Sequence, residues 1–190
     1  MRTAKAVAAA ILERDVPLCS DLPVVPPLPP GIVMGERGDV GIYIGWRENR
    51  NPFGTTLRLV PDALRVGLGC RRGTDAGTIR TAVEQVFQRH GIDLRAVRRA
   101  ASIDRKADEP GLIAFCGEMG WPLSFYSAAE LEIVPGELVT PSSFVKEVAG
   151  VDNVCERAAL LGAERLIVKK TARNGVTVAV AAERREVRFG

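Results

Sequence analysis

The second half of the chain alternates between short apolar runs and stretches whose apolar residues recur at helical spacing. Residues 64–68 form an apolar-rich run, which is typical of a buried strand. A glycine-rich turn follows at residues 69–73. Beyond it, apolar residues recur every three or four positions, at Ile79, Val83, Val86 and Phe87. The pattern predicts a strand, a turn and an amphipathic helix that ends at Gly91.

The same alternation continues over the next 60 residues or so. Further strands are expected at residues 97–103 and 123–126. Asp104 is predicted to cap a helical segment that lies between them and stops at Gly120. Ser127 is predicted to open a short helix, because Glu130 three residues later completes a capping box.

Toward the C-terminus the sequence predicts two more helical stretches and a hairpin. The helical stretches are residues 142–148 and 151–161, and the strands are residues 165–170 and 176–181. Asn174 and Gly175 favour a type I′ turn between those strands, because both tolerate a positive φ. Alternating strands and helices followed by a hairpin predict an α/β protein. The expected form is a three-layer α/β/α sandwich with a mixed, mostly parallel sheet that ends in a C-terminal β-hairpin.

Residues 1–63 have a different pattern. Residues 3–14 have helical periodicity, but six prolines between positions 17 and 30 predict an extended connection rather than a helix or a central strand. Short strands are expected at residues 40–44 and 56–60. This part is too small and proline-rich to bury a core alone. We therefore expect one domain over residues 64–190, preceded by the remnant of another.

Composition narrows the class of protein. Of the 190 residues, 46% are hydrophobic and 26% charged, which is ordinary for a globular protein in water. A net charge of +3 and 5% aromatic residues argue against a nucleic-acid binder. No apolar run is long enough to cross a membrane. Four scattered cysteines and one histidine suggest no zinc site, and they suit a reducing cytoplasm.

The edge where the parallel strands end is the expected place for a ligand. The loops there are residues 69–74, 103–108 and 124–127. Two of them carry paired basic residues, which are Arg71 with Arg72 and Arg105 with Lys106. Because guanidinium groups match carboxylates, the pattern predicts a site for a substrate with several carboxylates. The alternative is a tight turn with solvated basic side chains.

Other polar residues have both a chemical and a structural interpretation. Two neighbouring arginines would lower the pKa of Cys70, but no histidine lies near it in sequence, which favours a packing role. Asp104 is either an acid or base or a helix cap. Glu156 and Asn153 point either to a ligand or along the polar face of a helix. His90 complements the C-terminal end of its helix.

Five sequence blocks in order resemble the CbiG family of cobalamin biosynthesis, the cobalt-precorrin-5A hydrolases. The likeness is to their C-terminal domain, which also occurs alone as CobE. The blocks are residues 67–74 (GLGCRRGT), 103–112 (IDRKADEPGL), 141–146 (PSSFVK), 150–160 (GVDNVCERAAL), and 166–170 with 175–180 (LIVKK and GVTVAV). Residues 1–63 resemble the end of the portion that precedes this domain, including its central linker region.

The resemblance implies work on the oxygen-independent route to the corrin ring. The family opens the δ-lactone of cobalt-precorrin-5A and releases acetaldehyde. The implied partner is this cobalt-precorrin tetrapyrrole, a macrocycle fringed with acetate and propionate groups, and its cobalt arrives with the substrate, so no separate cofactor is expected. The family-motif positions taken as substrate-binding are Gly67, Gly69, Cys70, Arg71, Arg72, Lys106, Ser142 and Glu156.

Attack of water on the lactone carbonyl needs a base and a donor for the developing oxyanion. Asp104 is the candidate base, and the turn amides after Gly69, together with Arg71, are the candidate donor. Full-length family members carry another domain before the central region, and the chain begins after it. Two interpretations stay open. The chain is the C-terminal part of the hydrolase, working with a separate N-terminal domain or other pathway enzymes, or it is a corrinoid-binding or transfer module without turnover. Nucleotide binding is disfavoured, because the turn lacks the Lys-Ser/Thr of a P-loop and an acidic ribose partner.

Overall fold

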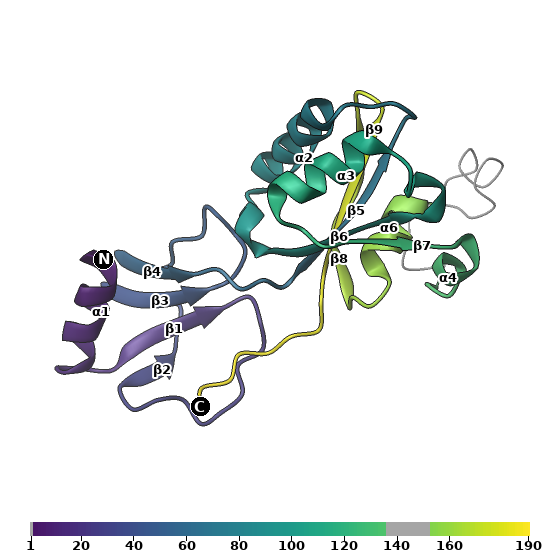
Figure 1. The fold of residues 1–190 in the computed structure, drawn as a ribbon. Helices are drawn as coiled ribbons and strands as arrows, with labels where there is room; N and C mark the ends of the chain where they lie inside the picture. The colour runs from purple at the N-terminus through teal and green to yellow at the C-terminus, as the bar shows by residue number, and fades with distance from the viewer. Residues whose placement is uncertain (1, 136–152) are drawn as a thin grey trace. The chain divides into compact units, whose positions relative to one another are not determined.

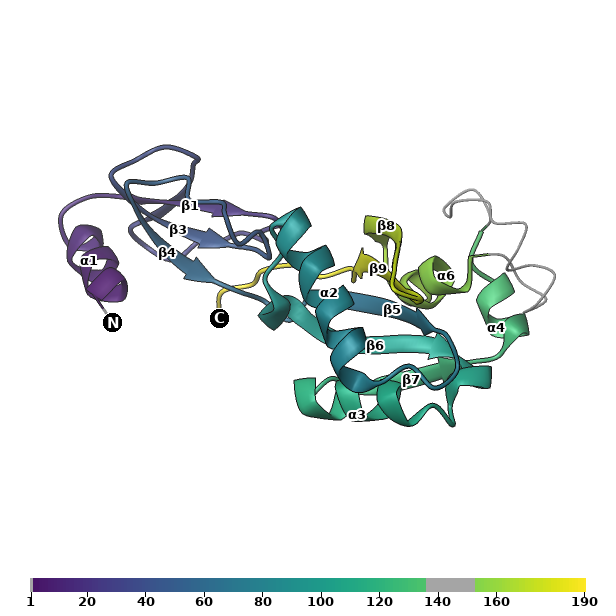
Figure 2. The same ribbon diagram turned by 90° about the horizontal axis from the view of Figure 1, so that it is seen from above.

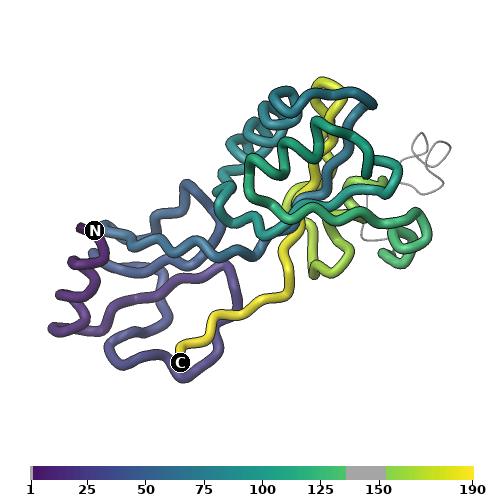
Figure 3. The backbone as a smooth tube through the Cα atoms, viewed as in Figure 1, coloured from purple at the N-terminus to yellow at the C-terminus, as the bar shows by residue number. Residues whose placement is uncertain are grey.

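The computed structural model describes residues 2–135 and 153–190 and divides the chain into two units (Figure 1). The first unit consists of Met1–Pro61, Gly91–Ala96 and Arg185–Gly190, and the second of Asp62–His90 and Val97–Arg184. Each unit has its own sheet. The backbone trace in Figure 3 shows the chain returning to the first unit at its C-terminal end.

The first unit is built on a four-stranded parallel sheet in the order β2-β1-β3-β4. Its strands are β1 (Val16–Ser20), β2 (Ile32–Met34), β3 (Val40–Ile44) and β4 (Thr55–Leu59). Helix α1 (Arg2–Ile11) packs on one face, where Val7 and Ala10 meet Leu18 and Ile42. Val187 and Phe189 from the C-terminal tail join this core. The front of the chain therefore shares in a buried core, which segments distant in sequence complete.

Pro17 lies in a strand with a neighbour on each side, which corrects the prediction of an extended connection. It pairs with Val33 of β2, whereas the pairing of β1 with β3 begins only at Leu18. The flanking backbone bonds, from Val16 N to Gly31 O and from Gly35 N to Leu18 O, both run to the β2 side. By the alternation of a parallel ladder, the nitrogen of Pro17 faces the other side, where no ladder bond is needed.

The second unit holds a five-stranded mixed sheet in the order β7-β6-β5-β9-β8. Its strands are β5 (Leu64–Cys70), β6 (Val97–Ile103), β7 (Leu123–Tyr126), β8 (Arg165–Arg173) and β9 (Val176–Ala182). Strands β5, β6 and β7 are parallel, and β9 is antiparallel to both β5 and β8. The prediction of an α/β protein with a mixed sheet and a C-terminal hairpin is confirmed, but the separate sheet of the first unit was not expected.

Helices lie on both faces of the five-stranded sheet (Figure 2). They are α2 (Ala76–His90), α3 (Pro110–Met119), α4 (Ala128–Glu132) and α6 (Val154–Leu160). Helix α6 packs against β5 so closely that a Cβ on Gly67 would lie 1.9 Å from the carbonyl oxygen of Cys155. The backbones of strand and helix can meet there only because residue 67 is glycine. Among the described helices, none is long and apolar enough to cross a membrane.

The structure contains the predicted capping box and type I′ turn, and one further helix cap. Asp75 caps α2 by accepting a hydrogen bond from Thr78 N at 2.8 Å. Ser127 and Glu130 form the predicted capping box. The turn between β8 and β9 has a positive φ at both central residues, 48° at Asn174 and 76° at Gly175, as a type I′ turn requires.

The prediction that Asp104 caps a helix reaching Met119 is wrong. Asp104–Lys106 forms a separate 3-10 turn, and α3 begins only at Pro110. Glu109, directly before the proline, has an extended conformation with φ −85° and ψ 103°. A proline disfavours helical geometry in the residue that precedes it, so the segment is divided there. The predicted helix at 142–148 lies outside the described residues.

Candidate functional site

Three backbone turns meet at one edge of the five-stranded sheet. The turns after β5 and β6 lie at this edge because those strands are parallel. The β8–β9 hairpin turn joins them, since β5 and β8 are both antiparallel to β9. The amide of Arg71 donates to the carbonyl oxygen of Gly175 at 2.9 Å, which fixes the first turn to the hairpin. The fold therefore brings together the basic loops that the sequence placed at the strand ends.

A buried carboxylate, Glu109, joins the two basic loops. One oxygen accepts a hydrogen bond from Gly73 N at 2.9 Å, and the other accepts from Lys106 Nζ at 2.9 Å and lies 3.6 Å from Arg72 Nε. The hydrogen bond from Gly73, followed by the one from Lys106, holds the pKa of Glu109 below its usual range. Glu109 is only 2% exposed. It is a positioning residue whose bracing role the sequence did not predict, although it stands in the acidic and basic segment between Asp104 and Pro110.

The basic side chains at this edge are held differently. Nη1 of Arg72 lies 3.3 Å from Asp108 Oδ2, in addition to the contact of this arginine with Glu109. Arg71 is exposed, and its stem lies against Gly175, where a Cβ would be 2.9 Å from Cδ of the arginine. Within the described part of the chain, no carboxylate pairs with the guanidinium group of Arg71. Arg71 is therefore the side chain at this edge best able to receive an anion.

The candidate reactive groups are less well placed. Cys70 is half-buried at the end of β5, and burial raises the pKa of its thiol, although the charge of Lys106 acts in the opposite direction. A raised pKa disfavours the thiolate, in keeping with a packing role. The side chain of Asp104 is exposed on the 3-10 turn. The amides of Arg71 and Gly73 already donate to Gly175 and Glu109, so they are not free to act as the expected oxyanion donors.

The other motif residues lie within the scaffold. Gly67 is buried beneath α6, and its carbonyl accepts a hydrogen bond from the Cys155 thiol at 3.1 Å. A Cβ on Gly69 would lie 2.5 Å from Thr177 Oγ1. Glu156 is fully buried in α6, where it accepts from Lys170 N at 2.6 Å. Asn153 caps that helix. Ser142 lies outside the described residues.

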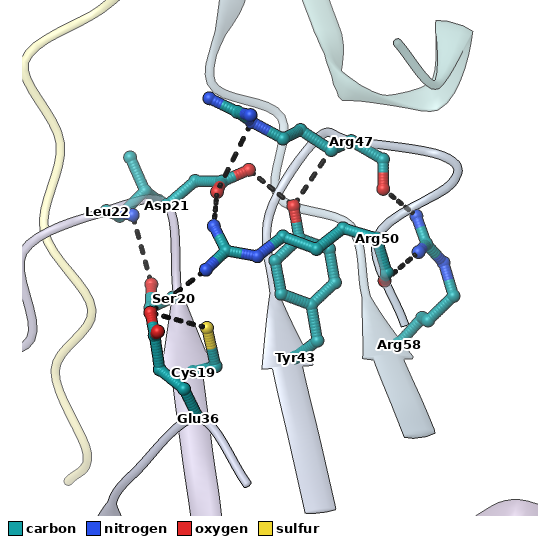
Figure 4. Close-up of polar contacts among 9 residues, drawn as sticks. All are labelled: Cys19, Ser20, Asp21, Leu22, Glu36, Tyr43, Arg47, Arg50 and Arg58. Carbon is teal, nitrogen blue, oxygen red and sulfur yellow. Dashed lines mark hydrogen bonds and ion pairs between the residues drawn. The ribbon is translucent and has the colours of Figure 1, made fainter. Parts of the chain in front are cut away.

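A second polar cluster, which sequence reasoning missed, lies where β1 and β3 of the first unit end (Figure 4). Tyr43 donates its hydroxyl hydrogen to Asp21, which also accepts from Arg50 Nη1 at 3.0 Å. The backbone amide of Arg47 donates to the hydroxyl of the same tyrosine, and the guanidinium group of Arg58 lies over its ring. Asp21 and Arg50 are 29 positions apart in sequence, so no local motif could have revealed the contact.

The second unit is thus an α/β domain with a basic edge, braced by an internal carboxylate, where its parallel strands end. Residues 64–181, more than half of the chain, match the family described as "Cobalamin synthesis G C-terminus". The chain belongs to this family of cobalamin biosynthesis, which confirms the resemblance found in the sequence.

Two relatives show how much of each protein the match covers. A cobalt-precorrin-5A hydrolase from Priestia megaterium is 34% identical over 123 residues, which are 64% of this chain and 32% of that protein. Protein CobE of Sinorhizobium sp is 37% identical over 121 residues, which are 62% of this chain and 79% of that protein. The matched segment therefore spans about a third of the hydrolase but most of CobE.

Solved structures extend the likeness. A crystal structure of CobE, a protein from the cobalamin pathway, is 32% identical with a TM-score of 0.59, and the match covers 63% of this chain and 89% of that one. A cobalamin biosynthesis protein G homologue from Sulfolobus solfataricus is 20% identical with a TM-score of 0.53. That match covers 95% of this chain and 55% of the other. At this identity it shows a shared fold alone.

Proposed function

We propose that this chain binds the cobalt-precorrin-5A intermediate at the basic edge of its five-stranded sheet and forms the C-terminal part of a cobalt-precorrin-5A hydrolase. The observation that carries the proposal is the exposed guanidinium of Arg71 beside Arg72 and Lys106. The substrate is fringed with acetate and propionate groups, and guanidinium groups bind carboxylates in two-pronged fashion. The hydrolase relative supports the assignment of substrate.

Opening of the δ-lactone by water would need groups that this edge supplies only in part. The guanidinium of Arg71 is a donor for the developing oxyanion, whereas the amides of Arg71 and Gly73 are already bonded. Asp104 is the remaining candidate base, although no side chain in the described ranges hydrogen-bonds its carboxylate. A base that nothing orients contributes little to proton transfer. Catalysis therefore calls for a further group, and we propose that a separate N-terminal domain of the longer hydrolases supplies it.

A second candidate function is corrinoid binding or transfer without turnover. The CobE relative favours it, because the matched segment makes up 79% of that protein. In that relative the domain stands nearly alone, so it has a use without the rest of the hydrolase. Under this alternative the basic edge binds the macrocycle, and the domain transfers it to another enzyme of the pathway.

The domain division follows the same proposal. The substrate-facing domain, a three-layer α/β/α sandwich, lies within residues 64–190, apart from residues 91–96 and 185–190, which belong to the first unit. Residues 1–63 form the end of the family's central region. The likeness to the Sulfolobus solfataricus protein, which covers both units, supports this division. All four cysteines are free thiols, which supports a reducing, cytoplasmic setting.

One experiment separates the two candidates. The purified chain is mixed with cobalt-precorrin-5A, the corrinoid absorption spectrum is followed for binding, and trapped acetaldehyde is followed for turnover. Binding with acetaldehyde release, by the chain alone or with the N-terminal domain of a longer hydrolase added, supports the hydrolase. Asp104→Asn should then lower the rate by less than about a hundredfold, because no side chain in the described ranges orients this base. Binding without acetaldehyde, both with and without that added N-terminal domain, supports the transfer module. An absorption spectrum that stays unchanged at every protein concentration would refute both.

A further inference from the structure

We propose that the first unit carries a separate binding site for a small carboxylate, formed by Arg47 and Arg50 where β1 and β3 end. This site does not depend on the function proposed for the second unit. It rests on the topology of the parallel sheet, on a rigid buried anchor, and on a surface carboxylate that already occupies part of the position (Figure 4).

The topology places the cluster at the switch point of the sheet. In the order β2-β1-β3-β4, the chain leaves β1 toward one side of the sheet and leaves β3 toward the other. The two connections therefore diverge between β1 and β3. Ligands of open parallel sheets bind in the crevice that such divergence leaves outside the carboxyl ends of the strands. Asp21 follows β1, and Arg47 and Arg50 follow β3.

A buried pair anchors the site. Tyr43 is fully buried and donates its hydroxyl to Asp21, whose side chain is only 4% exposed. Burial, together with this hydrogen bond, raises the pKa of Tyr43 well above its usual value, so it stays a donor. Gly45 passes directly over the pair, and a Cβ there would lie 2.3 Å from the tyrosine hydroxyl oxygen and 2.4 Å from Asp21 Oδ2. The anchor therefore depends on glycine at position 45.

The anchor and a third arginine hold the loop that carries the binding groups. Asp21 fixes Arg50 through Nη1 at 3.0 Å. Arg58 donates to the carbonyl oxygen of Arg50 at 2.7 Å and to that of Arg47, and its guanidinium carbon lies 5.2 Å from the centre of the Tyr43 ring. The loop is braced at both arginines, so an incoming anion would meet groups that are already in place.

Glu36 shows what the site accepts. Its carboxylate lies 3.0 Å from Arg50 Nη2, although its side chain is 74% exposed. An exposed ion pair of this kind contributes little to stability, so a ligand carboxylate can take its place. Arg47 lies on the other side of Asp21 from Glu36, with its side chain 63% exposed, and its Nε is 3.8 Å from Asp21 Oδ1. Arg50 lies 3.0 Å from both carboxylates, whereas the contact of Arg47 with Asp21 is longer, so a ligand carboxylate that bridges Arg47 and Arg50 would give the exposed Arg47 a close partner.

The test is an NMR titration of the ¹⁵N-labelled full chain with citrate at constant ionic strength. The chemical shifts of the Arg47 and Arg50 amide signals report binding. We expect saturable shifts at both arginines. Arg47→Gln should weaken citrate binding about fivefold or more, whereas Glu36→Gln should tighten it about threefold, because it removes the competing carboxylate. Arg14→Gln, an exposed arginine before β1 at the opposite end of the strands, is the charge-matched control and should leave the affinity unchanged.

Several results would overturn the proposal. Absence of a saturable shift at Arg47 and Arg50 would remove the site, and equal weakening by Arg14→Gln would reduce the effect to net charge. Weaker binding in Glu36→Gln would show that this carboxylate builds the site rather than competes for it. Inorganic phosphate is titrated in parallel, and tighter binding of phosphate than of citrate would contradict the carboxylate assignment. A thermal melt of each variant verifies that the first unit is folded.

Discussion

Three arginines of the second unit converge on Glu183, and removing its charge tests how the end of the five-stranded sheet is held together. Arg65 Nη2 and Arg99 Nε lie 3.3 and 3.6 Å from one carboxylate oxygen, and Arg98 Nε lies 3.8 Å from the other. Glu183 is 12% exposed and the side chain of Arg65 is 8% exposed. In Glu183→Gln, a nearly buried guanidinium would lose its only carboxylate among the described residues.

The cost in the free energy of unfolding depends on the contacts that each arginine keeps in the variant. Removing one partner of a buried ion pair costs about 3–5 kcal/mol. Arg65 retains the carbonyl of Leu161 and the hydroxyl of Tyr126, and Arg98 and Arg99 are about a third exposed, so water replaces part of the loss. We therefore expect a loss of about 2–3 kcal/mol in the free energy of unfolding. For a chain of this length the midpoint of thermal unfolding should fall by about 4–12 °C.

The assay must report on the second unit alone. Of the two tryptophans, Trp46 belongs to the first unit and Trp121 to the second. Fluorescence-detected urea unfolding in a Trp46→Phe background therefore follows the second unit. Glu84→Gln in the same unit is the control, since its ion pair with Arg80 is exposed and should contribute less than about 1 kcal/mol. A loss in Glu183→Gln no larger than in this control would refute the reasoning.

Three further predictions concern the same unit. Gly67→Ala should cost about 1–3 kcal/mol in urea unfolding, because its Cβ would lie 1.9 Å from the Cys155 carbonyl oxygen, and an unchanged midpoint would contradict that close approach. The pKa of Glu109 is lowered from 4.5, so its stabilisation is present above that value and lost as the pH falls through the folded-state pKa. Glu109→Gln should therefore flatten the stability profile below about pH 5, and an identical acid profile would argue against the brace. Burial raises the pKa of Cys116 and of Cys155 to about 12, so iodoacetamide at pH 8 should modify half-buried Cys70 before either, as mass spectrometry would show, and equal rates would count against that burial.

Elements that depend on local pattern were predictable from the sequence. Strands β3 and β7 coincide with the predicted runs, and the capping box and type I′ turn depend on residues that are neighbours in the chain. Strand β1 was missed because a proline normally excludes an interior strand. Pro17 is tolerated because the pairing of β1 with β3 begins only at the next residue, Leu18. Strand β3, which sets this register, is more than twenty positions away in the sequence.

The candidate site was predictable in the same uneven way. Parallel strands ending at one edge were enough to bring Arg71, Arg72 and Lys106 together. Glu109 accepts a hydrogen bond from the Gly73 amide because the following proline divides the segment at this residue. The sequence suggested a continuous helix there instead. The contact between Asp21 and Arg50 in the first unit forms only when β1 and β3 are paired. The hydrophobic periodicity and residue spacing of the sequence therefore do not predict it.

Corrinoid affinity at the basic edge of the second unit is the most direct test of the account. The double variant Arg71→Gln with Arg72→Gln removes two positive charges at this edge, and Arg89→Gln with Arg184→Gln removes two exposed charges elsewhere in the same unit. In an absorption titration with cobalt-precorrin-5A, the first pair should weaken binding at least about tenfold, or 1.4 kcal/mol, and the second should leave it nearly unchanged. Equal affinity of the first pair and the unaltered chain would contradict the claim that this edge holds the substrate.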